Sequence, residues 1–169
     1  MGDQSVNSPS QTIGPMWGFA LMFEGCEQAV DSGDPGATVV TGLILDGDGE
    51  PVGHPDSMIE VWRGDQWARG RADEEGRYRV VVRKPEPSEL EGVGTEAPYL
   101  KVTLFARGLL RAAQTRIYFP EEEEANAADP TLLLVPEDRR GTLIGRREGD
   151  ELVFDIHLQG DGETVFFGS

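Results

Sequence analysis

Short runs rich in β-branched and apolar residues recur along the chain, separated by clusters of Gly, Pro, Asp and Glu. This pattern constrains the fold most, because short strands between regular turn signals are typical of β-sandwiches. The 22 glycines and 11 prolines also fit a turn-rich β protein better than a helical bundle. We therefore predict an all-β fold, an antiparallel β-sandwich with short helices in its connections. The predicted strands are residues 37–45, 58–62, 78–82, 99–106, 114–119 and 152–158.

Two acidic, glycine-containing clusters predict tight turns between these strands. Residues 46–49 (DGDG) supply residue types that tolerate the positive φ of a tight hairpin, and residues 73–76 (DEEG) predict a second turn. The first cluster, extended to Glu50, faintly resembles a calcium loop. Calcium needs oxygens at fixed offsets, and the EF-hand spacing is absent, so a solvated hairpin turn is favoured.

Two short helices are predicted between the later strands. Residues 120–124 (PEEEE) place proline and acids where a helix start favours them, and a solvated helix start is favoured over a cation site. Residues 136–138 (PED) begin a second helix, with Leu143 and Ile144 as its apolar contacts.

The first 36 residues differ in character from the rest. We expect residues 1–36 to be an N-terminal arm and linker, and residues 37–169 to be the sandwich domain. The arm carries large apolar side chains without a long element in which to bury them, which predicts a subunit interface. The alternative is that they fold onto this chain's own sandwich. These side chains are Trp17, Phe19, Leu21 and Phe23.

The charge balance argues against anionic partners. Fifteen basic and 31 acidic residues give a formal net charge of −16, so we expect neither nucleic acid nor a membrane surface as partner. The apolar stretch 13–23 is interrupted by Pro15 and Gly18 and does not read as a signal peptide. The single cysteine, Cys26, excludes an intrachain disulfide and a Cys-based zinc site, and a cytoplasmic location is expected.

No complete catalytic set can be assembled from the residue pattern. His54 falls in a predicted loop and His157 on a predicted strand, and nothing places a carboxylate or nucleophile beside either. Arg107 ends the strand predicted at 99–106, where a guanidinium could bind a carboxylate. An ordinary solvated arginine paired with a local acid is the alternative that the pattern favours. Two function classes stay open: a binding or regulatory sandwich, or one chain of an enzyme whose reactive groups lie elsewhere.

Several segments, in matching order and spacing, resemble the α subunits of the protocatechuate 3,4-dioxygenases, which are non-haem iron(III) intradiol dioxygenases. The resemblance runs from about Ser10 to Phe167 and implies a β-sandwich. The segments are residues 10–15 (SQTIGP), 59–62 (IEVW), 104–108 (LFARG), 115–119 (TRIYF), 139–144 (RRGTLI), 154–160 (FDIHLQG) and 162–167 (GETVFF).

The resemblance also implies that this chain holds no metal. In the family a homologous β chain holds Fe(III) with two tyrosines and two histidines, and the matching positions here fall on Ser88, Tyr99, Lys101 and, in a shortened loop, Trp67. An arginine of the catalytic chain corresponds to Glu96. Lysine and serine are poor Fe(III) ligands. The resemblance thus implies Fe(III) on a partner β subunit and no catalytic residue on this chain.

The family's α chain lines the active site at the interface between the two chains, and this implies the site residues here. The matching substrate-binding positions are Thr12, Gly14, Pro15 and Arg107, with Arg107 orienting the substrate carboxylate. The implied reaction is O2-dependent intradiol cleavage of protocatechuate to 3-carboxy-cis,cis-muconate. Shorter loops at 62–70 and 85–99, and Met16 in place of an aromatic, affect the pocket shape. The alternative is a stand-alone β-sandwich binding module that has lost the enzymatic function.

Overall fold

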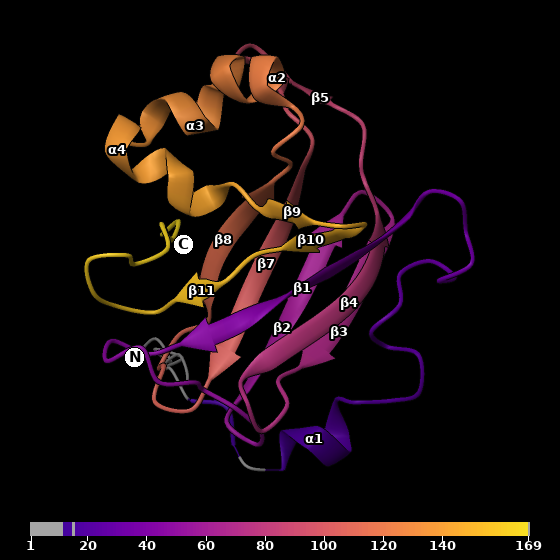
Figure 1. Ribbon diagram of the computed structural model, residues 1–169, viewed down its shortest axis with the longest axis vertical. Coiled ribbons are helices and arrows are strands. Elements are labelled where there is room, and N and C mark those ends of the chain that lie inside the picture. Colours follow the sequence, from indigo (N-terminus) through magenta and orange to yellow (C-terminus); the bar gives the residue numbers. More distant parts are fainter. Residues whose placement is uncertain (1–11, 15, 169) are drawn as a thin grey trace, which may run out of the picture.

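The computed structural model describes residues 12–14 and 16–168, and in this part of the chain two β-sheets pack face to face (Figure 1). One sheet is antiparallel, in the order β3-β2-β7-β8. In the other, β1 pairs with β4 along one edge, and with β10 and then β11 along the opposite edge. The bounds are β1 Ala37–Leu45, β2 Ser57–Arg63, β3 Gln66–Arg71, β4 Arg77–Arg83, β7 Tyr99–Ala106, β8 Ala113–Tyr118, β9 Arg146–Glu148, β10 Glu151–Val153 and β11 Ile156–His157.

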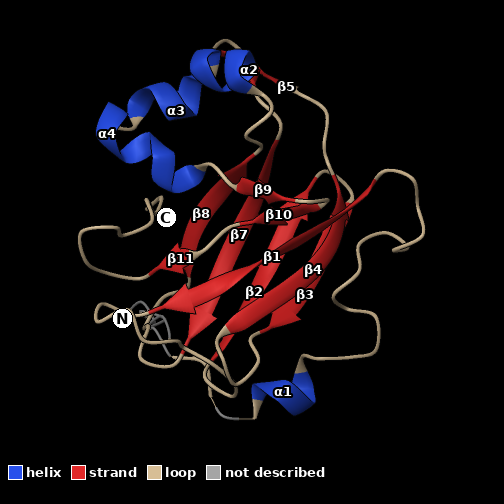
Figure 2. Cartoon of the chain, viewed as in Figure 1, coloured by secondary structure: helices blue, strands red, loops and turns tan. Residues whose placement is uncertain are grey.

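Short helices lie at the two ends of the sandwich (Figure 2). The arm forms α1 (Trp17–Ala20) at one end. At the other end α2 (Glu123–Ala128), α3 (Pro130–Leu134) and α4 (Glu137–Arg140) follow β8, beside a hairpin of β5 (Ser88–Leu90) and β6 (Gly94–Glu96). Among the described residues, no helix has both the length and the apolar character needed to cross a bilayer.

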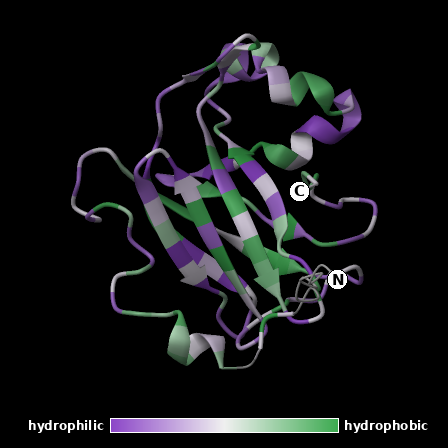
Figure 3. Cartoon of the chain, turned by 180° about the vertical axis from the view of Figure 1, so that it is seen from behind, coloured by the Kyte–Doolittle hydropathy of each residue, from purple (hydrophilic) through white to green (hydrophobic). Residues whose placement is uncertain are grey.

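The core fills the space between the sheets because alternate strand residues point inward. Seen from behind, hydrophobic and hydrophilic residues alternate along the strands (Figure 3). Leu100, Val102 and Leu104 of β7 all point into the core. They pack with fully buried side chains of both sheets, including Val40, Ile44, Ile59, Tyr78, Val80, Ile117, Leu152 and Ile156.

The predicted fold class is confirmed, and the predicted strands at 37–45 and 99–106 coincide with β1 and β7. The sequence pattern does not predict β3, however. Its inward residues are Ala68 and Gly70, so no apolar run marks it. A Cβ on Gly70 would lie 3.1 Å from the Arg79 carbonyl oxygen, so the small residue lets β3 approach β4 closely.

The single strand predicted at 152–158 is in fact two strands, and both run parallel to β1. The backbone pairing with β1 is interrupted between β10 and β11, where the Asp155 carboxylate, in place of a backbone carbonyl, accepts the Leu43 N–H at 2.8 Å. At the same point the buried Tyr78 hydroxyl donates to the Phe154 carbonyl. A Cβ on Gly42 would lie 1.9 Å from that carbonyl oxygen, so only glycine fits there.

The two predicted turns form, but neither joins paired strands. Residues 46–50 make a tight turn, in which Asp46 Oδ1 accepts the N–H groups of Asp48 and Glu50. The predicted hairpin turn forms locally, because Leu45 and Pro51 make an antiparallel bridge. The chain then crosses to the other sheet, so the turn does not join two paired strands. Asp73 caps the second turn in the same way, and β3 and β4 on its two sides belong to different sheets.

The two predicted helices correspond to α2 and α4, but α2 begins only at Glu123, so Pro120 and Glu121 precede it and the predicted start is wrong. The residue pattern does not predict α3, which lies between them. Asp129 begins α3, because its carboxylate accepts the N–H groups of Thr131 and Leu132 and Pro130 occupies the first turn. Leu143 is fully buried and Ile144 packs beside it, as expected.

Candidate functional site

The arm folds back against the end of the sandwich through Trp17. Its indole Nε1 donates to the Pro55 carbonyl oxygen at 2.7 Å, and its ring meets His54 edge-on at 6.3 Å. Trp17 is therefore buried against its own chain, and its predicted place in an exposed interface is corrected. Phe19, in contrast, is 86% exposed, and Phe23 is also exposed.

The arm also brings Thr12 onto the end of β7. The Thr12 hydroxyl donates to the Ala106 carbonyl oxygen at 3.3 Å and accepts the Gly108 N–H at 2.9 Å. These two contacts lie on either side of Arg107. The structure thus places together two of the predicted substrate-binding residues, which are 95 positions apart in the sequence.

Arg107 presents its guanidinium to solvent next to Asp56. The side chain is 73% exposed, and its Nη2 lies 3.1 Å from Asp56 Oδ2. The Arg107 backbone N–H donates to the Asp56 carbonyl oxygen at 2.7 Å. Thr12, Asp56 and residues 106–108 are called the Thr12–Arg107 site below.

The other two predicted substrate-binding residues belong to the same stretch of the arm. Gly14 is exposed, its carbonyl oxygen accepts the Trp17 N–H at 3.3 Å, and a Cβ there would meet nothing within 4 Å. Pro15 lies outside the described residues. Gly14 is thereby joined to Trp17, the residue that anchors the arm to the sandwich.

Asp56 is a member of the site that the residue pattern does not single out. It precedes β2, and Arg107 follows β7. The antiparallel register of β2 and β7 pairs Ser57 with Ala106, so the two charged residues lie just beyond the last pair. Only the pairing of two strands distant in the sequence could have identified this contact.

A second polar cluster surrounds Tyr99 at the opposite end of β7. The Glu96 carboxylate accepts Arg116 Nη1 at 2.7 Å and lies 3.9 Å from Arg63 Nη2. The guanidinium carbons of Arg63 and Arg116 lie 4.0 and 3.9 Å from the centre of the Tyr99 ring. The Ser88 hydroxyl accepts a hydrogen bond from Arg63 and approaches Glu96 at 3.5 Å. These five residues are called the Tyr99 cluster.

Burial within the cluster keeps the Tyr99 hydroxyl protonated. Burial raises the pKa of Tyr99 and outweighs the two neighbouring guanidinium groups. Burial alone would lower the pKa of Arg116, but the hydrogen bond to Glu96 and the nearby Tyr118 hydroxyl raise it above its ordinary value. The cluster therefore holds two cations and one carboxylate around a neutral tyrosine.

This donor set does not fit Fe(III). Of the four positions that match the family's ligands, only Ser88 and Tyr99 come together, and two guanidinium groups occupy the space around them. Lys101 is exposed on the outer face of its sheet, and Trp67 stacks on Phe23 with ring centres 6.0 Å apart. Within the described residues, no three His, Cys, Asp or Glu side chains are grouped to hold a metal ion.

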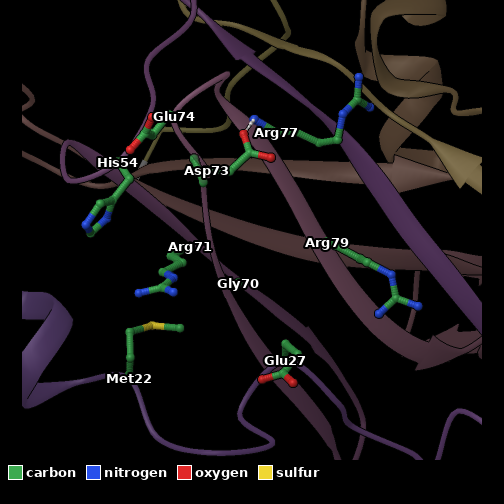
Figure 4. A pocket seen from close by; sticks show the side chains of 10 residues that line it. Met22, Glu27, His54, Gly70, Arg71, Asp73, Glu74, Arg77 and Arg79 are labelled. Atoms are coloured by element: carbon green, nitrogen blue, oxygen red, sulfur yellow. Dashed lines mark hydrogen bonds between the residues drawn. The ribbon is translucent and has the colours of Figure 1, made fainter.

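A cavity of about 580 Å³ opens between β3 and β4, and no member of the Tyr99 cluster lines it. Figure 4 shows Arg71 on the side of His54 and Met22, whereas Arg77 and Arg79 extend from β4 in the other direction. The guanidinium groups do not converge on one ligand position. No member of the Thr12–Arg107 site lines this cavity.

Comparisons with known proteins give the family of the chain. It is 34% identical to the protocatechuate 3,4-dioxygenase alpha chain of Burkholderia cepacia, covering 95% of this chain and 96% of that one. It is 32% identical to the Pseudomonas putida protein of the same name, covering 95% of each. The fold matches the dioxygenase domain of a carbohydrate-binding fusion protein from Streptomyces sp. SirexAA-E, at a TM-score of 0.58 and 20% identity, covering 79% of this chain and 87% of that one. No family model matches. The identity to these two relatives over 95% of this chain shows that it belongs to the family of protocatechuate 3,4-dioxygenase alpha chains, an oxidoreductase family.

Proposed function

We propose that this chain is the non-iron subunit of a two-chain intradiol dioxygenase and lines the active site at the interface with a homologous iron-bearing beta subunit. The observation that carries the proposal is the Thr12–Arg107 site. It combines the exposed Arg107 guanidinium with the Thr12 contacts to the backbone on both sides of Arg107, at the positions that match the family's substrate-binding residues. A guanidinium binds a carboxylate through parallel hydrogen bonds, which suits a substrate such as protocatechuate.

The surface of the arm supports a partner at this end of the molecule. Met16, Phe19, Leu21 and Phe23 are all exposed, whereas Trp17 anchors the arm to its own sandwich. Apolar side chains gathered in this way on a surface mark sites of protein association. We propose that residues 1–36 include the docking surface for the beta subunit and that residues 37–169 form the sandwich domain.

The proposed reaction is the O2-dependent cleavage of protocatechuate between its two hydroxyl-bearing carbons, giving 3-carboxy-cis,cis-muconate with both oxygen atoms in the product. We assign Fe(III) to the beta subunit, because the Tyr99 cluster does not fit it. This chain contributes the pocket wall and the orientation of the substrate carboxylate. Because this chain has a single cysteine and therefore no intrachain disulfide, we propose a cytoplasmic location for the complex.

The test is co-expression with the homologous chain that carries the family's His-x-His pair. We expect the two chains to co-purify as a defined complex that contains iron and cleaves protocatechuate. The beta chain expressed alone should be much less active or insoluble. If no complex forms and the beta chain alone is fully active, the chain is a stand-alone binding module and the proposal is wrong.

A further inference from the structure

We propose that Asp56 is a positioning residue that holds the Arg107 guanidinium in the orientation that receives an acidic substrate. This inference rests on the proposed function and adds a residue to it. Asp56 contacts Arg107 twice, through its carbonyl oxygen to the backbone N–H at 2.7 Å and through Oδ2 to Nη2 at 3.1 Å. The backbone contact places the base of the side chain, and the carboxylate places its tip.

The carboxylate is needed because nothing else described in the structure holds the tip. Arg107 donates no other side-chain hydrogen bond or ion pair among the described residues, and most of its side chain is exposed. An exposed arginine samples many rotamers, which lowers the fraction of time that it spends in the binding orientation. A guanidinium has five N–H donors, so the contact at Nη2 leaves other donors free for a substrate carboxylate.

The loop that carries Asp56 is itself held by backbone contacts. The Asp56 N–H donates to the Gly53 carbonyl oxygen at 2.8 Å, and the Pro55 carbonyl oxygen accepts the Trp17 indole. Replacing the Asp56 side chain leaves these bonds in place, as well as the bond from the Arg107 N–H. A variant at this position therefore tests the carboxylate and not the fold of the loop.

Two roles for the carboxylate predict opposite signs. If it positions Arg107, its removal weakens the binding of acidic substrates. If it acts only as a negative charge that repels the substrate carboxylate, its removal improves their binding. Asp56→Asn separates the two, because the amide retains an oxygen that can accept from Nη2 but carries no charge.

The experiment measures kcat and KM of the assembled two-chain enzyme for protocatechuate and for catechol, which lacks the carboxylate. Asp56→Ala should raise KM for protocatechuate about three- to fivefold, as expected for a partly exposed ion pair, and leave catechol within about twofold. Asp56→Asn should recover most of the loss. Asp150→Asn, an exposed acid in the β9–β10 turn with no ion pair among the described residues, is the matched control.

The double variant completes the test. Asp56→Ala should have no further effect on protocatechuate when Arg107 is already alanine, because a positioning residue acts only through the group that it positions. If Asp56→Ala acts equally on both substrates, adds to Arg107→Ala, or lowers KM for protocatechuate, the inference is wrong. If Arg107→Ala itself has no acid-specific effect, the substrate-orienting role in the proposed function fails as well.

Discussion

Glu96 and Arg116 form a buried ion pair, with the carboxylate oxygen 2.7 Å from Nη1 and the Glu96 side chain only 7% exposed. The pair closes the Tyr99 cluster and joins β6 to β8 by side chains alone. Because both arginines of the cluster depend on this one carboxylate, its removal would leave two cations partly buried without a counter-ion.

Glu96→Ala should therefore lower the free energy of unfolding by about 3–5 kcal/mol, the typical effect of breaking a buried pair. The measurement is urea unfolding followed by circular dichroism. The control is Glu148→Ala, which removes a carboxylate that is 61% exposed and paired with an equally exposed Arg146. Its effect should stay below about 1 kcal/mol. Equal effects for the two variants would contradict the role given to Glu96.

Gly42→Ala should destabilise the chain by about 3 kcal/mol, because the new methyl group meets the Phe154 backbone and not a movable side chain. The same substitution should weaken the hydrogen bond from Tyr78 to that carbonyl. Thermal unfolding of the variant measures the effect, with Gly141→Ala as control, where a Cβ meets nothing within 4 Å. A Gly42→Ala protein as stable as the parent would show that β10 and β11 can shift away from β1.

The lowered pKa of Glu121 predicts that the stability of the fold depends on pH in the acid range. Burial by itself raises the pKa of Glu121, but hydrogen bonds from Arg147 and Lys84 outweigh it and bring the value to about 2. A depressed pKa stabilises the fold fully above the ordinary value near 4.5, and the stabilisation is lost as pH falls from there to about 2. Glu121→Gln should thus reduce stability at pH 6 and have a much smaller effect near pH 2. Unfolding at both pH values is the measurement, and an equal loss at both would refute the assignment.

Arg107→Ala in the assembled enzyme should lower kcat/KM for protocatechuate about ten- to a hundredfold, the loss expected from one charge-assisted hydrogen bond. Catechol turnover should not change, because catechol has no carboxylate. The iron content should not change either, because we do not propose Arg107 as an iron ligand. Arg111→Ala, a nearby exposed arginine with no ion pair among the described residues, serves as the charge-matched control. An equal loss with both substrates would make Arg107 a structural residue of the interface.

The chain expressed without a partner should bind no stoichiometric iron after washing with a chelator and should not cleave protocatechuate. The reason is the Tyr99 cluster, whose two guanidinium groups repel a trivalent cation and whose tyrosine stays protonated. Metal analysis and the visible spectrum are the measurements. One iron per chain, with the absorption of a tyrosinate–iron bond, would overturn this prediction.

Local patterns in the sequence predict the central strands of this protein well. β1 and β7 are recognised from their own residues, because alternation and β-branched side chains report burial on one face of a strand. β3 has no such signal, because its buried face consists of Ala68 and Gly70. The break between β10 and β11 has no local signal either. It depends on Asp155 binding the Leu43 N–H, 112 residues away, and on Tyr78 donating to the Phe154 carbonyl, 76 residues away.

The candidate site, too, can be predicted from the sequence only in part. Family-like segments in the sequence point to Thr12 and Arg107, but they do not show that Thr12 binds the backbone on both sides of Arg107 or that Asp56 pairs with Arg107. Those contacts exist because β2 and β7 pair in one register, which places Asp56 opposite Arg107, and because Trp17 ties the arm to the Pro55 carbonyl. The residue pattern is enough to predict most of the core strands, β1 and β7 above all, and the residue types available to the site. Which charges meet depends on the folded arrangement, because strand pairing and arm docking bring together side chains that no local pattern relates.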